Sequence, residues 1–210
     1  MHDTLSLRLA YPRKRDSIRR DAFLLRAKLG LEKTLNFPIL HFIENVLPKI
    51  DSSFFLEVEE DENMPGIQAE YLPTENVIRV RQSVYDAAAA GFWWARFTLA
   101  HELGHYYYHD ERSVRYAVLD LGQRMPPDFD PERQANAFAA ELLVPINLIE
   151  GMSIKQIAND CSVSYTVAKR QLFALSRIRK RQEKKRQVKK KKRSSLLSST
   201  ADRHKQSHPL

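Results

Sequence analysis

The sequence predicts an α+β fold in which a small antiparallel sheet packs on helices and a helical pair follows. Apolar residues recur at helix-type spacing along most of the chain, and strands are predicted within residues 56–80, where apolar residues alternate with polar ones. The chain has 210 residues, 43% of them hydrophobic, which suits one domain with a buried core plus a small appendage.

Helices are predicted where apolar residues recur every three or four positions. The first begins at Asp16 or Ser17, either of which can cap it, and ends near Leu29 before a glycine. A second runs from Pro38 to Leu47, with Pro48 expected to end it. The remaining helical predictions cover residues 87–109, 131–144 and two short helices within 153–175.

Strands are predicted in one region. Leu56 and Val58 alternate with glutamates, as in a half-buried strand. A hairpin follows, with alternation over Ile67 to Tyr71, a turn over residues 73–76, and a returning strand from Val77 to Val80.

The net charge of +8 is distributed unevenly along the chain. From Arg177 to Leu210 there are 14 Lys/Arg and two Asp/Glu, a net charge of +12. The first 176 residues therefore carry 20 basic and 24 acidic side chains, a net charge of −4. The basic character belongs to a tail, and the body is mildly acidic.

Several function classes are disfavoured by composition. The longest apolar run, Ala87 to Ala95, has nine residues, against the ~20 needed to span a bilayer, so no membrane association is expected. The N-terminal residues lack the continuous apolar core of a signal peptide. Cys161 has no partner cysteine for an internal disulfide, which favours a cytoplasmic location.

The segment His101-Glu102-Leu103-Gly104-His105 has the H-E-x-x-H spacing of a zinc site. Helical residues four apart lie about 40° apart in azimuth and about 6 Å along the axis, so both imidazoles can bind one ion. The surrounding apolar residues indicate a helix here; they are Phe97, Leu99, Ala100 and Leu103.

Two neighbours of these histidines are interpreted differently. Glu102 is displaced by about 100° from His101, so it can act on water near a metal rather than bind the metal itself. His109 continues the four-residue series but lies about 12 Å along the axis from His101, too far to share one ion. We interpret it as a helix-terminal residue bonded to local backbone.

A third ligand must come from another segment, and Glu132 is the best candidate. Asp130 suits a helix N-cap and Pro131 the first helical position, which places Glu132 in the first turn. Asn136 shares its face and can hydrogen-bond an imidazole. Glu141 lies about 180° round the helix, so only one of the two glutamates can face the metal. Geometry alone leaves open whether Glu132 is a ligand or simply favours a helix N-terminus.

Two blocks of sequence, Phe97 to His105 and Glu132 to Pro145, resemble the ImmA/IrrE family of zinc metallopeptidases. The first reads FTLAHELGH, with a further histidine four residues on, and the second reads ERQANAFAAELLVP. The resemblance extends over roughly Gly66 to Leu175. It departs from the family pattern at Val144, where methionine is usual.

The resemblance implies a zincin-like metallopeptidase with a Zn²⁺ cofactor. It implies that His101, His105 and Glu132 bind the metal and that Glu102 is the catalytic base. Two histidines and one glutamate leave zinc an open coordination position, as in catalytic rather than structural sites. The expected activity is that of a zinc metallo-endopeptidase.

The family resemblance also implies a substrate class, namely helix-turn-helix transcriptional repressors whose cleavage relieves repression. The sequence itself contains no substrate pocket that can be identified. The connection between His109 and Pro131 is long at about twenty residues. It either shapes substrate access or contains a short packed element; its apolar residues are Val114, Val118, Leu119 and Leu121.

Residues 153–175 can form a helix-turn-helix-like pair. In a DNA-binding interpretation Tyr165, Thr166, Lys169 and Arg170 would face the major groove, whereas in a structural one the pair is a packing subdomain. The basic segment 177–193 can contact DNA phosphates weakly and without sequence specificity. Since no aromatic residue follows Phe173, base stacking is not expected.

We therefore expect a zinc metallopeptidase domain over residues 1–150, a helix-turn-helix-like subdomain over 151–176, and a basic, disordered tail over 177–210. The leading hypothesis is cleavage of a regulatory protein. The alternatives are a DNA-binding regulator with a non-proteolytic zinc site, and a peptidase-like antitoxin or partner-binding module.

Overall fold

The computed structural model describes residues 5–109, 114–119 and 125–205. It is α+β, as the sequence predicts. The elements in chain order are β1 (Leu5–Ala10), α1 (Arg15–Lys28), α2 (Ile39–His41), η1 (Phe42–Val46), α3 (Leu47–Ile50), β2 (Phe55–Glu59), η2 (Asp61–Asn63), β3 (Ala69–Leu72), β4 (Val77–Arg81), α4 (Gln82–Ala89), α5 (Trp93–Tyr108), β5 (Val114–Leu119), α6 (Pro131–Leu143), α7 (Ile154–Asp160) and α8 (Tyr165–Lys205).

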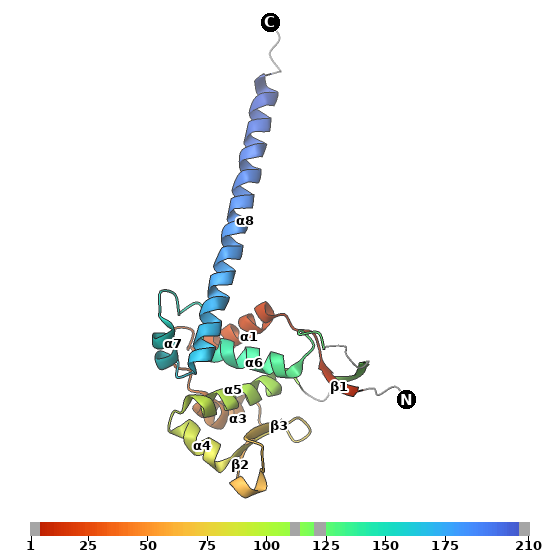
Figure 1. Ribbon diagram of the computed structural model, residues 1–210, viewed down its shortest axis with the longest axis vertical. Helices are drawn as coiled ribbons and strands as arrows, with labels where there is room; N and C mark the ends of the chain where they lie inside the picture. The colour runs from red at the N-terminus through yellow and green to blue at the C-terminus, as the bar shows by residue number, and fades with distance from the viewer. Residues whose placement is uncertain (1–4, 110–113, 120–124, 206–210) are drawn as a thin grey trace. The chain divides into compact units, whose positions relative to one another are not determined.

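Helices α5 and α6 form the centre of the body. Figure 1 shows α1 lying on α6, α6 beside α5, and the three-stranded sheet on the other side of α5. The side chains of Leu99, Leu103, Phe138 and Leu142 are fully buried in this core, as is Ile78 of the sheet. Helix α5, which carries His101 and His105, is thus packed between α6 and the three-stranded sheet.

The sheet next to α5 is mixed rather than purely antiparallel as predicted. Its strand order is β2-β4-β3. The predicted hairpin is confirmed, since β3 pairs antiparallel with β4 around a turn in which Asn76 has φ 54°. Strand β2, however, pairs parallel with β4. After β2 the chain passes through η2 to β3 at the opposite edge of the sheet, and it then turns back so that β4 lies between the two and runs in the direction of β2. Alternation alone does not distinguish these two pairings.

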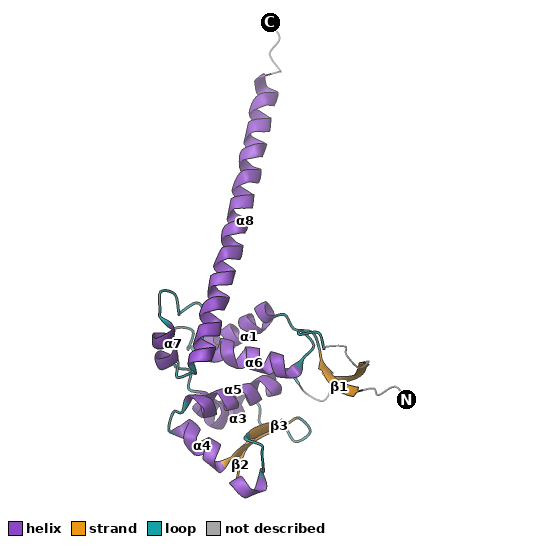
Figure 2. Cartoon of the chain, in the orientation of Figure 1, coloured by secondary structure: helices purple, strands orange, loops and turns teal. Residues whose placement is uncertain are grey.

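A second sheet of two strands was not predicted. Strand β1 pairs antiparallel with β5, with Leu5 opposite Leu119 and Ala10 opposite Val114 (Figure 2). The alternation of leucines at positions 5, 7 and 9 is the sequence signal for β1. The long connection after His109 thus contains a strand, while its residues 110–113 and 120–124, Leu121 among them, lie outside the described residues.

Two helix boundaries differ from the predictions. The single helix expected over residues 87–109 is two helices, α4 and α5, because Gly91 adopts φ +84° and turns the chain between them. The helix expected to stop at Pro48 instead passes through the π-helical η1 into α3. Pro48 lies in the first turn of α3, where a helix does not need its missing N–H.

The structure divides into two units, Met1–Gln171 and Leu172–Leu210. Helix α8 begins in the first unit and continues to Lys205, across much of the segment for which composition predicts disorder. Lysine, arginine, glutamine and leucine are good helix formers, and no glycine or proline interrupts the helix. Across the described residues, no helix combines the length and apolar character needed to cross a bilayer.

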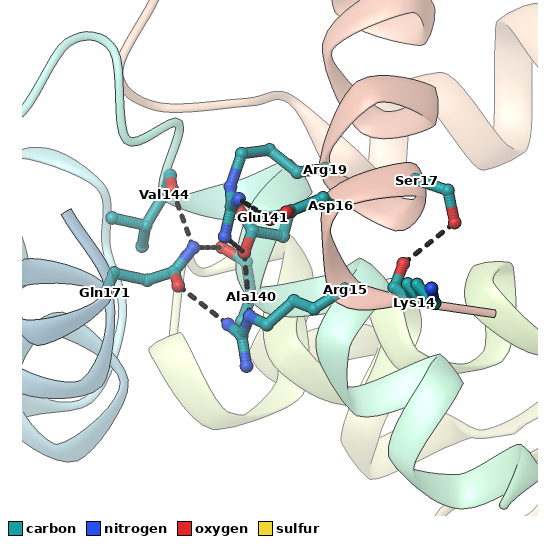
Figure 3. A network of polar contacts seen from close by, with 9 residues as sticks. All are labelled: Lys14, Arg15, Asp16, Ser17, Arg19, Ala140, Glu141, Val144 and Gln171. Atoms are coloured by element: carbon teal, nitrogen blue, oxygen red, sulfur yellow. Dashed lines mark hydrogen bonds and ion pairs between the residues drawn. The ribbon is translucent and has the colours of Figure 1, made fainter. Parts of the chain in front are cut away.

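A buried carboxylate fastens α1 to α6. The Glu141 side chain accepts hydrogen bonds from Arg15 Nε at 2.9 Å and from Arg19 Nε and Nη2, both at 3.0 Å (Figure 3). Glu141 is only 3% exposed. Gln171, near the start of α8, donates to the Ala140 carbonyl at 2.9 Å and accepts from Arg15 Nη2. Three segments distant in sequence therefore meet at one carboxylate.

We expect Glu141→Gln to lower the free energy of unfolding by about 1–3 kcal/mol, because the new amide would present N–H groups to two guanidinium donors. Urea unfolding measures this change. Glu70→Gln is the control, since Glu70 pairs with Arg79 at 3.6 Å in a half-exposed position and should lose at most about 0.5 kcal/mol. Equal losses in the two variants would contradict the assignment.

Candidate metal centre

Helix α5 places the two predicted histidines on one face. His101 and His105 are half-buried, and their Nε2 atoms lie 3.0 Å apart. Nitrogen atoms this close on successive turns leave room for a single ion between them and a third ligand. The helical spacing argued from the sequence is therefore realised in the structure.

Helix α6 brings Glu132 to the same point. The Asp130 carboxylate accepts from the N–H of Glu132 and of Arg133, so it is the N-cap, and Pro131 is the first helical residue. Glu132 Oε2 lies 3.2 Å from His101 Nε2, and Oε1 lies 3.4 Å from His105 Nε2. Among the described residues, these three side chains offer ligand atoms all within 4.8 Å of one another.

The spacing of these atoms fits zinc. Tetrahedral coordination with bonds of about 2.0–2.1 Å places neighbouring ligand atoms roughly 3.3 Å apart. The separations of 3.0, 3.2 and 3.4 Å between the nitrogen and oxygen atoms bracket that value. Two imidazoles and a carboxylate are also a donor set that zinc accepts.

The carboxyl group of Glu102 lies beside this cluster without belonging to it. Its Oε2 accepts a hydrogen bond from the Tyr71 N–H of β3 at 2.9 Å, and Glu102 is 7% exposed. Burial raises its pKa, although the neighbouring His101 and His105 act in the opposite direction. The β3 backbone therefore fixes the orientation of this carboxylate.

Charge interactions within the cluster are strong. Hydrogen bonds from His101 and His105 lower the pKa of Glu132 far below its usual range. Burial lowers the pKa of His101, but the hydrogen bond to Glu132 and the nearby Glu102 outweigh it and raise the pKa overall. Both shifts express the attraction that the carboxylates exert on a cation at this point.

A chain of hydrogen bonds leads from His105 to two backbone carbonyls. The Gln134 amide NH₂ donates to the Tyr11 and Asp128 carbonyls, each at 2.8 Å. Because those carbonyls can only accept, Gln134 Oε1 is turned toward His109 Nε2, 3.2 Å away. His109 Nδ1 in turn lies 2.8 Å from His105 Nδ1.

This chain dictates the tautomer of His105. Since Gln134 Oε1 accepts, His109 carries its proton on Nε2, and its Nδ1 accepts from His105 Nδ1–H. The lone pair of His105 is then on Nε2, the atom that faces His101 and Glu132. His109 is the C-cap of α5, as predicted for a helix-terminal residue, and it is not part of the cluster of candidate ligands. The bonds of its side chain to His105 and Gln134 were not predicted.

Other polar side chains on or near α5 and α6 have different partners. Asn136 donates from Nδ2 to the Glu132 carbonyl at 2.7 Å. Its side chain lies near enough to His101 to contribute to the raised pKa of that imidazole, in keeping with its predicted place on the same helix face as Glu132. Glu141 points away and binds arginines. Tyr106 and Tyr108 direct their hydroxyl groups to Asp51 and Asp21.

Gly104 allows α5 and α6 to approach closely. A Cβ atom at this position would lie 2.9 Å from Ala135 Cα and 3.1 Å from the Ala135 carbonyl oxygen. Backbone atoms cannot move aside as a flexible side chain can. Glycine is therefore required at position 104 for α6 to bring Glu132 within reach of His101 and His105.

We expect Gly104→Ala to force the helices apart, destabilising the protein by about 1–3 kcal/mol and weakening zinc binding. Thermal unfolding and competition with a chromophoric zinc chelator measure the two effects. Adding Ala135→Gly should not restore either, because it removes only the methyl group at 3.3 Å and leaves the backbone contacts. Full rescue by this second change would show that the backbone approach is not the constraint.

We expect His109→Phe to weaken zinc binding about 10- to 100-fold, because His105 loses the partner that fixes its tautomer. The same chelator competition measures it, with circular dichroism to check folding. His41→Phe, at an exposed position on α2, is the matched control and should leave zinc affinity unchanged. Unchanged affinity in a folded His109→Phe protein would refute the role assigned to this hydrogen-bond chain.

We compared the chain with curated proteins and with solved structures. No curated protein matches the sequence. One solved structure that resembles it is described as a Mycobacterium tuberculosis transcriptional regulator, with 12% sequence identity and a TM-score of 0.47. The match covers 73% of this chain and 45% of that one, so the chain spans less than half of its length.

The family comparison matches the segment that contains the site. Residues 95–173 match the family described as IrrE N-terminal-like domain, Peptidase_M78. The segment includes both histidines, Glu102 and Glu132, together with the helix pair that follows. This match confirms the ImmA/IrrE resemblance of the two sequence blocks, both of which lie within it.

Proposed function

We propose that this protein is a zinc-dependent endopeptidase that cleaves a regulatory protein. His101, His105 and Glu132 hold the metal, and Glu102 is the catalytic base. The observation that carries the proposal is the convergence of three ligand atoms beside a buried carboxylate that is not itself a ligand. A purely structural metal site has no use for such a group.

Each protein group has a defined task in hydrolysis. Zinc supplies Lewis-acid chemistry, acidifying water and polarising the scissile carbonyl. Glu102 accepts a proton from the attacking water and later donates it to the nitrogen of the leaving amine. A pKa raised by burial suits this exchange, because the group must both take up and release a proton. The Tyr71 N–H holds the carboxylate in place throughout.

The proposed substrate is a helix-turn-helix transcriptional repressor, whose cleavage relieves repression. This follows from the family resemblance, and the −4 charge of the first 176 residues is compatible with binding a basic, DNA-associated protein. The basic segment 177–193 would add weak, salt-sensitive contact with DNA. We place the protein in the cytoplasm, where the buried, unpaired Cys161 stays reduced.

The alternative is a DNA-binding or partner-binding regulator with a non-proteolytic zinc site. Helices α7 and α8 meet at a short turn, and Tyr165, Thr166, Lys169 and Arg170 at the start of α8 are all exposed. Such an arrangement could contact a major groove. The buried Glu102 beside the ligands favours the enzyme over this reading.

The deciding prediction concerns Glu102→Gln. We expect the variant to bind zinc as the wild type does but to lose cleavage of a helix-turn-helix repressor encoded by a neighbouring gene, because an amide cannot accept the proton. Electrophoresis with intact-mass analysis follows cleavage, and metal content is measured in parallel. A chelator should abolish the wild-type activity.

The outcomes separate the two functions. Zinc retained with cleavage lost supports proteolysis, whereas identical behaviour of wild type and variant toward the repressor excludes it. Tight repressor binding without cleavage by the zinc-loaded wild type would favour the partner-binding alternative.

A further inference from the structure

A cavity of about 510 Å³ opens beside the metal centre. It lies between α5, α6 and the first turns of α8, all within the first unit. Its lining combines three arginines with apolar side chains; those used below are Arg15, Arg133, Arg170, Asn136, Phe97 and Val167. The volume lies in the range of pockets that bind small groups rather than flat surfaces.

The cavity is lined by residues that neighbour the candidate metal site. Asn136 lines the cavity, donates to the Glu132 carbonyl at 2.7 Å, and lies near enough to His101 to contribute to the shift in its pKa. Phe97 precedes His101 by one turn of α5, and Arg133 follows Glu132 directly. A polypeptide bound at the metal centre would therefore have a neighbouring residue within reach of this cavity.

One of the three arginines is held in place by the protein. Arg15 donates from Nε to the buried Glu141 and from Nη2 to Gln171 at 2.8 Å (Figure 3). These bonds orient its guanidinium group and leave Nη1 without a hydrogen bond to any described residue. Glu141 pairs with both Arg15 and Arg19, so the charge of Arg15 is partly balanced. Arg15 therefore contributes a fixed hydrogen-bond donor to the cavity more than an excess positive charge.

The other two arginines supply uncompensated charge. The side chains of Arg133 and Arg170 are exposed and form no hydrogen bond or ion pair with the residues that the structure describes. The nearest acidic neighbour in sequence, Glu132, turns its carboxylate toward the two histidines instead. Two guanidinium groups thus face a partly enclosed space with no carboxylate of their own.

We propose that this cavity binds the carboxylate of an acidic residue in the polypeptide substrate, close to the bond that is cut. Guanidinium groups match carboxylates with paired, charge-assisted hydrogen bonds. Phe97 and Val167 would contact the aliphatic part of that residue. DNA phosphates are usually met by basic residues spread along an open surface, whereas these arginines converge on a cavity that adjoins the metal centre.

The inference rests on the proposed peptidase function, so a binding experiment without cleavage is needed. The probe is a fluorescein-labelled, C-terminally amidated nonapeptide of alanine and glycine with one central glutamate, titrated by fluorescence polarisation into zinc-loaded, full-length Glu102→Gln protein. We expect it to bind about tenfold or more tightly than the peptide with central glutamine. Arg133→Glu with Arg170→Glu should abolish this preference.

A matched control reverses two charges elsewhere. Arg20 and Lys155 are exposed on α1 and α7 and do not line the cavity. Arg20→Glu with Lys155→Glu should keep the preference for glutamate. Equal binding of the two peptides, including no binding of either, overturns the proposal, as does an equal loss in both double variants. The proposal is also overturned if the glutamine peptide with a free C-terminal carboxylate binds better than the amidated glutamate peptide, because the cavity would then bind a chain terminus. It is overturned as well if Arg133→Glu with Arg170→Glu weakens binding of duplex DNA but not of the glutamate peptide.

A cleavage experiment separates this inference from the proposed function. Zinc-loaded wild type is incubated with a peptide library made by digesting a proteome, and cut sites are mapped by mass spectrometry. A preference for aspartate or glutamate at one fixed position relative to the cut bond supports the cavity assignment. A change of that preference to lysine or arginine when the Arg133→Glu, Arg170→Glu variant is used strengthens it. Cleavage with no acidic preference overturns the assignment alone. Absence of cleavage by wild type overturns the peptidase function, while the binding experiment still judges the cavity.

Discussion

The close approach of α5 and α6 at Gly104 is the constraint on which the site depends. The two histidines lie on one helix and the third candidate ligand on another, so their separation is set by how near the helix axes come. With a Cβ at position 104 only 2.9 Å from Ala135 Cα, any larger residue would widen that gap. Because bond lengths to zinc vary by only a few tenths of an ångström, a small displacement of α6 would take Glu132 out of reach of an ion held by the two histidines.

Backbone carbonyls determine the chemistry of the site as well as its shape. The Tyr11 and Asp128 carbonyls orient Gln134, and through His109 they fix which nitrogen of His105 is free to bind metal. A backbone carbonyl can only accept, so it is the two carbonyls that fix which end of the Gln134 amide faces His109. The N-terminal segment thereby contributes to a site from which it is distant in sequence.

Local patterns in the sequence were sufficient for part of this site. The His101–His105 spacing and the Asp130 helix start depend on residues within one or two turns, so periodicity and capping rules predict them. The Tyr71 bond to Glu102 spans 31 positions, and the parallel pairing of β2 with β4 follows from the path of the chain, neither of which alternation encodes. Gly104 belongs to the H-E-x-x-H segment, but the need for glycine there comes from the contact with Ala135 on α6, which the local sequence does not show.

Helix α6 serves several purposes because its faces point to different neighbours. At 100° per residue, Glu132 faces the histidines, and Arg133 and Asn136 lie about 100° and 40° away, toward the cavity. Gln134 and Glu141 lie about 200° and 180° away, facing the N-terminal segment and α1. The candidate metal ligand, the charge at the cavity and the attachment of α1 thus lie on one helix of thirteen residues. Rotation of α6 by one position, about 100°, would displace all three together, so the buried Glu141 ion pairs, which fix α6 against α1, also constrain the position of Glu132.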